Sequence, residues 1–153
     1  MILYYTYKQK TKVFAQAFGQ FLNLPTYQLV SDINNKSGLG FIFTALKLTF
    51  TNKAAPINNM PATLPEEIYV CSPIWGGSLA APVKYFFQNT QLKNTKVNLI
   101  LTASTPTEKY KNAATEYLQK YCIPGKVYLF ATSDKVPPEE DVLVEQLREM
   151  DLL

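Results

Sequence analysis

The stretch "EEIYVCSPIWGGSLAAPVKYFF" at residues 66–87 contains the pattern that decides the fold. Its run "IYVCS" at 68–72 is short and apolar enough for a strand buried at the centre of a sheet. The small and aromatic residues of "SPIWGG" follow as a loop, and Pro82 suits the first turn of a helix with an apolar stripe. The stretch therefore predicts a central strand, a loop over 72–79 and a helix.

The same alternation of short apolar runs and helix-period segments continues on both sides. Further strands are predicted at 2–6, 26–30, 96–104 and 126–132, and further helices at 11–22, 39–50, 107–121 and from Pro137 onward. Five strands alternating with about five helices predict an α/β fold with three layers, a doubly wound five-stranded parallel sheet between helices.

The segment at 39–50 is ambiguous. Leu46, Leu48 and Phe50 alternate as in a strand, whereas Ile42, Ala45, Leu46 and Thr49 fit a helix. We favour the helix.

The composition predicts one domain over residues 1–153, because 153 residues with 47% hydrophobic content fill one core. The N-terminus lacks the basic region and cleavage site of a signal peptide. The longest apolar stretch, Gly38 to Phe50, is too short to span a bilayer. We therefore expect a cytoplasmic protein with no membrane partner.

Histidine is absent from the chain, and the two cysteines, Cys71 and Cys122, each lie in apolar sequence. This excludes the spacing of a zinc site and every Ser-His or Cys-His nucleophile arrangement. We expect no metal ligand and no catalytic acid or base.

The charge is unevenly distributed. Residues 1–65 carry six lysines against Asp32 alone, whereas residues 134–153 carry seven acidic side chains against Lys135 and Arg148. The basic half favours an anionic ligand or partner. Nucleic acid is a poor candidate, since the lysines are scattered and do not alternate with aromatic residues.

In a doubly wound sheet, ligands bind outside the carboxyl ends of the strands where strand order reverses. The loops that reach this edge are 6–11, 72–79, 102–107 and 132–137. They hold no phosphate-binding P-loop, and the single G-x-G, at 38–40, has Phe43 where a dinucleotide fingerprint needs glycine.

Residues 66–87 resemble the corresponding segment of the flavodoxin family, in which an apolar strand runs into Pro-x-Trp, glycine and a proline-led helix. The residues that carry this resemblance are Ser72, Pro73, Trp75, Gly76, Gly77 and Pro82. The resemblance implies an FMN cofactor whose ring lies against Trp75, with contacts from Pro73, Ile74, Gly76 and Gly77. An indole gives a flat ring a stacking surface, and glycine lets backbone groups approach its edge.

The first loop, "TYKQKT" at 6–11, is similar to the family's phosphate loop [ST]-x-T-G-[NQ]-T at Thr6 and Thr11 only. Lys8, Gln9 and Lys10 replace the inner residues. Gln9 is the largest departure, because a Cβ resists backbone conformations that glycine permits. Two lysines beside a helix N-terminus can hold a phosphate by charge, so the resemblance implies a phosphate site. A solvated turn is the alternative.

The third loop, "LTASTPTEKY" at 101–110, would supply hydroxyl contacts to the polar edge of the ring through Thr102, Ser104 and Thr105. The aromatic residue that often covers the second face of the ring is missing from its centre, and Tyr110 is the nearest candidate. A turn and helix cap would equally explain these hydroxyls.

The sequence therefore predicts a flavodoxin-like protein that binds FMN without a covalent bond and transfers electrons. Its partner would be a redox protein or a small-molecule electron acceptor. Two alternatives stay open: a flavin-free binding or regulatory domain on the same fold, and an NAD(P)H-dependent FMN quinone or nitro reductase. Whether the chain is an enzyme, and whether it forms a homodimer, are also open.

Overall fold

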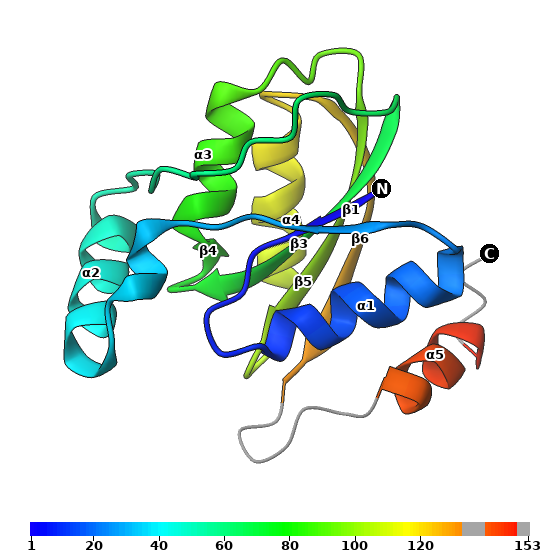
Figure 1. Cartoon of the computed structure of the whole chain (residues 1–153), viewed down its shortest axis with the longest axis horizontal. Helices are drawn as coiled ribbons and strands as arrows, with labels where there is room; N and C mark the ends of the chain where they lie inside the picture. The colour runs from blue at the N-terminus through cyan, green and yellow to red at the C-terminus, as the bar shows by residue number, and fades with distance from the viewer. Residues whose placement is uncertain (133–139, 150–153) are drawn as a thin grey trace.

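The structure, a computed structural model, describes residues 1–132 and 140–149. Strands and helices alternate along the chain (Figure 1). In order, the elements are β1 (Ile2–Tyr4), α1 (Lys10–Leu22), β2 (Thr26–Gln28), the 3-10 helix η1 (Asp32–Asn35), α2 (Gly38–Phe50), β3 (Glu67–Trp75), β4 (Ser78–Leu79), α3 (Ala81–Asn89), β5 (Lys96–Ala103), α4 (Glu108–Leu118), β6 (Ile123–Ala131) and α5 (Glu140–Glu149).

The main sheet has the order β2-β1-β3-β5-β6, and every pair in that path is parallel. The predicted doubly wound sheet with β3 at its centre is confirmed. The structure adds β4, a two-residue strand that pairs antiparallel with the end of β3 inside the loop expected at 72–79. The helix favoured for 39–50 is also confirmed. The predicted start of the last helix, at 137–139, lies outside the described residues.

Helices cover both faces of the sheet (Figure 1). Successive side chains of a strand point to opposite faces, so Ile2 and Tyr4 pack with α1 and α5, whereas Leu3 and Tyr5 pack with α3 and α4. The sheet thus divides the core into two apolar layers, which is why its central strands are buried on both sides.

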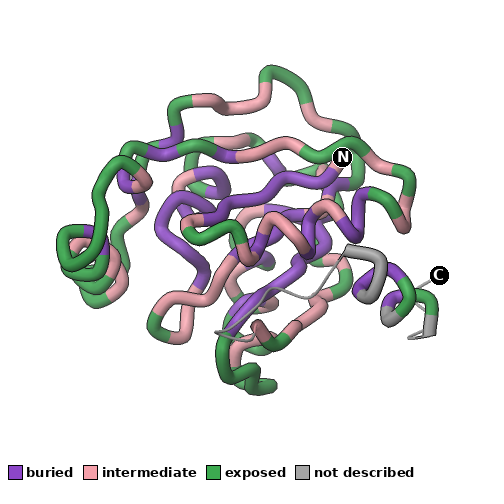
Figure 2. The backbone as a smooth tube through the Cα atoms, turned by 60° about the horizontal axis from the view of Figure 1, so that its bottom comes forward, coloured by how far each residue is buried: buried purple, intermediate pink, exposed green. Residues whose placement is uncertain are grey.

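Helix α2 lies apart from these layers, at the periphery of the molecule (Figure 1). Figure 2 shows most of its length as exposed, and Phe41 is its one buried residue. Within the described ranges, no helix combines the length and the apolar character needed to cross a bilayer.

Candidate functional site

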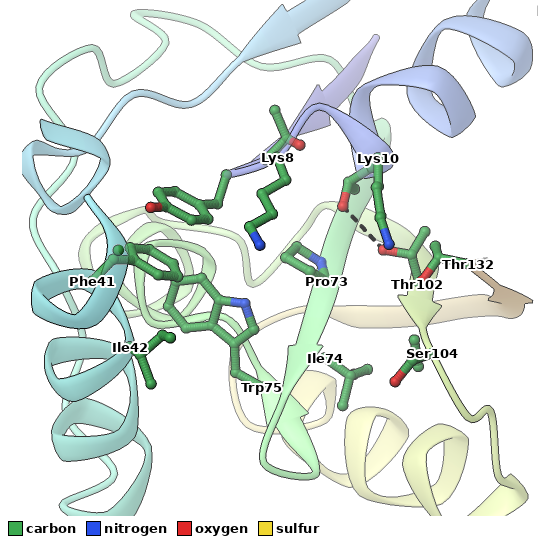
Figure 3. Close-up of a pocket in the computed structure, with 15 residues that line it drawn as sticks. Lys8, Lys10, Phe41, Ile42, Pro73, Ile74, Trp75, Thr102, Ser104 and Thr132 are labelled. Atoms are coloured by element: carbon green, nitrogen blue, oxygen red, sulfur yellow. Dashed lines mark hydrogen bonds between the residues drawn. The ribbon is translucent and has the colours of Figure 1, made fainter. Parts of the chain in front are cut away.

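A cavity of about 340 Å³ lies where the carboxyl ends of β1, β3 and β5 meet (Figure 3). The chain passes from β1 to β2 on one side and places β3 on the other, so this is the edge where strand order reverses. The lining residues are Thr6, Tyr7, Lys8, Lys10, Thr11, Gly38, Phe41, Ile42, Pro73, Ile74, Trp75, Thr102, Ala103, Ser104 and Thr132.

One end of the cavity is formed by the start of α1. The first backbone N–H groups of a helix have no partner within the helix and carry partial positive charge, which attracts anions. Lys8 and Lys10 add two ammonium groups there, and none of the described lining residues is acidic. In Figure 3 the Lys8 side chain extends toward Pro73 and Trp75. This end of the cavity is therefore suited to an anion.

The turn into α1 depends on Gln9. This residue has a left-handed backbone (φ 61°, ψ −7°) and forms no side-chain capping hydrogen bond. A residue with a Cβ is disfavoured in this region by roughly 1–2 kcal/mol. Gln9 thus has the left-handed backbone at the position where the flavodoxin phosphate-loop pattern has glycine, and it adopts that backbone at a cost.

Thr11 joins this end of the cavity to β5. Its Oγ1 lies 3.0 Å from Thr102 Oγ1 in a buried hydrogen bond between side chains far apart in sequence. Both threonines are almost fully buried, so the bond fixes the start of α1 against the sheet. The anion end and the floor of the cavity are thereby held in register.

The other end of the cavity is aromatic and is built around Trp75. The Tyr5 and Phe41 rings both meet the indole nearly at right angles, with centroids 5.6 and 5.4 Å from it. The Tyr7 ring stacks parallel on Phe41 with centroids 3.3 Å apart. These contacts fix the orientation of the indole.

Burial raises the pKa of the Tyr5 phenol well above its usual value, and its hydroxyl donates to Asn34 Oδ1 at 2.7 Å. Tyr5 is therefore a neutral support for Trp75 at physiological pH.

Gly76 and Gly77 form the turn between β3 and β4. Trp75 pairs with Ser78, so these two glycines are the whole loop, and both have positive φ (53° and 86°). Two-residue hairpin turns of the I′ type require positive φ at both central positions. A Cβ on Gly76 would lie 2.6 Å from Thr49 Cγ2 of α2. The hairpin turn alone therefore explains why both positions are glycine. The turn also places the end of β3 against α2.

Most residues predicted for the site line this one cavity: Thr6, Lys8, Lys10, Thr11, Pro73, Ile74, Trp75, Thr102 and Ser104. The structure does not place Gln9, Gly76, Gly77 or Thr105 among the lining residues. Their cofactor roles stay predictions. Tyr110 lies beside Gly77 at a separate cavity of about 70 Å³ instead of over the larger one.

Sequence reasoning missed Tyr7, Gly38, Phe41, Ile42, Ala103 and Thr132. Tyr7 was inside the first loop, but the family pattern leaves its position unspecified. Phe41 and Ile42 were in the ambiguous segment, and nothing local shows that α2 reaches the end of β3. Thr132 begins the fourth loop expected at this edge, whose remaining residues are not described.

The cavity combines cationic groups at one end, flat apolar groups at the other and hydroxyls on its floor. The described part of the chain contains no cluster of metal-ligating side chains. This arrangement suits a flat ring with an anionic tail, which it would bind by stacking and charge.

No protein-family model and no curated protein matches this sequence. Solved structures do match. A protein of Bacteroides uniformis, classed provisionally as a flavoprotein, is 12% identical with a TM-score of 0.73, over 97% of this chain and 96% of that one. A Lactobacillus acidophilus flavoprotein, solved in complex with FMN, is 18% identical with a TM-score of 0.66, over 95% of each chain. A flavodoxin from the domain Archaea is 15% identical with a TM-score of 0.50, over 99% of this chain and 98% of that one. Parallel strand order, helices on both faces and near-complete coverage together show that this chain has the flavodoxin-like fold.

Proposed function

We propose that this protein binds FMN non-covalently in the cavity at the ends of β1, β3 and β5, and exchanges electrons through it. The observation that carries the proposal is one cavity with lysines at a helix N-terminus at one end and Trp75 at the other. The FMN complex of the structurally similar Lactobacillus acidophilus flavoprotein supports the choice of ligand.

The residues present fit FMN. A volume of about 340 Å³ is within the usual range for cofactor sites. Thr6, Lys8, Lys10 and Thr11 would hold the phosphate. Trp75, with Pro73 and Ile74, would contact the ring, and Thr102 and Ser104 would bond its polar edge.

When bound, the flavin supplies the redox chemistry, and the chain supplies binding and orientation. Trp75, whose indole is held by the Tyr5 and Phe41 rings, would orient the flavin ring. The two lysines would neutralise the phosphate, and no protein acid or base would be required. The electron partner would be a redox protein or a small-molecule acceptor.

Trp75 is the one tryptophan of the chain, so its fluorescence reports binding at this site directly. We expect FMN to quench it in a saturable titration. Changing Lys8→Ala together with Lys10→Ala should weaken FMN binding by about a hundredfold or more, since each lysine would contribute a charged hydrogen bond to the phosphate. Riboflavin, which has no phosphate, should bind both proteins equally.

Lys93→Ala is the matched control, because Lys93 is exposed and does not line the cavity. FMN that binds the double variant as tightly as the wild type would show that the phosphate is held elsewhere. A chain that binds neither FMN nor riboflavin would refute the proposal. It would support the flavin-free domain, which the absence of glycine from the loop at 6–11 favours.

A further inference from the structure

Helix α2 is apolar on both of its sides. Its inner side, with Phe41, Ala45 and Leu48, packs against the body of the molecule. Its outer side carries a second apolar row, here called the α2 stripe, which consists of Leu39, Ile42, Phe43, Leu46 and Phe50. A helix with apolar side chains on two opposite sides is ordinarily buried on both sides. This one is covered on one side only.

The α2 stripe is continuous and strongly exposed. Leu39, Phe43, Leu46 and Phe50 follow one another at intervals of four, three and four, so they lie on one side of the helix. Ile42 lies beside this row, three residues after Leu39 and four before Leu46. Phe50 is 84% exposed, Leu39 71% and Phe43 69%. With side chains of this size, the stripe presents on the order of 600 Å² of apolar surface, as large as the largest patches on monomeric proteins. Exposing this much apolar surface to water costs free energy.

The stripe is complementary to itself. In an antiparallel pair of α2 helices with position 39 opposite position 50, Leu39 meets the second copy's Phe50 and Phe43 meets the second copy's Leu46. In both of these pairs a large ring faces a smaller branched chain. Ile42 faces the aliphatic stem of the second copy's Lys47, which is the one charged residue of α2. No like charges meet at the centre of this contact.

We propose that the α2 stripe is the interface of a symmetric homodimer in which two α2 helices pack antiparallel. Two copies would bury roughly 1,200 Å², which reaches the lower end of the range for specific interfaces. A two-fold axis makes both copies use the same surface, as the self-complementary order of the stripe requires. Ile42 also lines the large cavity, so the second copy covers the outer side of that wall. The proposal does not depend on flavin binding.

The mass in solution tests the dimer. Light scattering over a concentration series should give twice 17.3 kDa for the wild type. Phe43→Asp with Leu46→Asp should weaken association at least about 30-fold, because a central apolar contact is replaced by repelling charges. Ile123→Asp is the control, since Ile123 is 49% exposed on β6 and outside the stripe. Circular dichroism should show all three proteins folded. A wild type that stays monomeric, or a double variant that still dimerises, would overturn the proposal.

Cross-linking tests the antiparallel register. A short bismaleimide should link a Leu39→Cys chain to a Phe50→Cys chain when they are mixed, and link neither chain to itself. Positions 39 of the two copies would be about 16 Å apart along the helices, given a rise of 1.5 Å per residue. Cys71 and Cys122 are buried, so wild type should not react. Cross-linking of Leu39→Cys to itself would overturn the register. Binding to anionic lipid vesicles by a chain that stays monomeric would assign the stripe to a membrane surface instead.

Discussion

Helices α1 and α2 are both thirteen residues long, and both contribute residues to the large cavity, yet the fold uses them differently. Helix α1 buries Phe14, Ala15, Ala17 and Phe18 against the sheet and α5. Helix α2 buries Phe41 alone. Apolar content therefore does not decide burial; the surface that the topology sets opposite each helix decides it.

The difference follows from where the chain goes next. Helix α1 lies between two neighbouring parallel strands, so its crossover lays it on the sheet. Helix α2 connects β2 to β3, which lie on either side of β1. The chain returns from α2 to β3 through residues 51–66, which contain no helix or strand. The long return lets α2 stand at the edge, where it touches the body through Phe41 and through Thr49 beside Gly76.

The largest expected effect separates the two helices directly. Phe18 is fully buried and packs on Tyr128 and Phe130, so Phe18→Ala should lower the free energy of unfolding by about 3–5 kcal/mol. Phe43→Ala on the exposed side of α2 should change it by less than about 0.5 kcal/mol. Urea unfolding at a concentration where the wild type is monomeric measures both. Equal losses would mean that α2 is packed as tightly as α1.

The next effect concerns the contact that holds α2 to the β3–β4 turn. Gly76→Ala should destabilise by about 2 kcal/mol, because alanine is strained at φ 53° and its Cβ would meet Thr49 Cγ2. Gly77→Ala should cost about 1 kcal/mol, since it has strain but no close contact.

A second substitution isolates the contact with α2. Thr49→Ser removes the methyl group and keeps the hydroxyl that donates to Ala45 O, so it should restore part of the loss in the Gly76→Ala background. If thermal melting shows no recovery, strain alone explains the effect.

A smaller effect is expected where α1 begins. Gln9→Gly removes a strained Cβ, and after the added entropy of the unfolded chain a gain of about 0.5 kcal/mol should remain. Gln9→Ala keeps the Cβ and should bring no gain. If neither substitution changes stability in urea, the left-handed turn is not a source of strain.

The smallest effect depends on pH and concerns the hydrogen bond between Lys84 of α3 and Asn52, which lies just after α2. Lys84 on α3 is almost fully buried and donates from Nζ to Asn52 Oδ1 at 2.8 Å. Burial lowers the pKa of Lys84 below its ordinary value of 10.5. Between the two pKa values the unfolded chain binds more protons than the folded chain, so stability rises with pH in that window.

The difference in unfolding free energy between the wild type and Lys84→Met isolates this group from other titrations. As the pH rises toward 10.5, the wild type should become more stable relative to Lys84→Met. A difference that stays constant across that range would mean that Lys84 keeps its ordinary pKa in the fold.

Much of the fold was predictable because its signals are local. The apolar run at 68–72 and the proline-led helix after it required a buried parallel strand, and the structure confirms β3 at the centre of the sheet. The topological rule then placed the loops after β1, β3 and β5 at one edge. That is why Thr6, Trp75 and Thr102, far apart in sequence, were all predicted near one site and do line one cavity.

The sequence by itself therefore determined the order of the main strands and helices, the edge of the sheet at which the cavity lies and the aromatic residue that marks that edge. Only the tertiary structure decided what supports Trp75, because the Tyr5 ring, just after β1, and the Phe41 ring of α2 contact it across segments far apart in the sequence. It also showed that Gly76 and Gly77 close a hairpin and that α2 keeps an apolar side exposed. Periodicity shows which side of an element is apolar; three-dimensional packing decides whether another surface covers it.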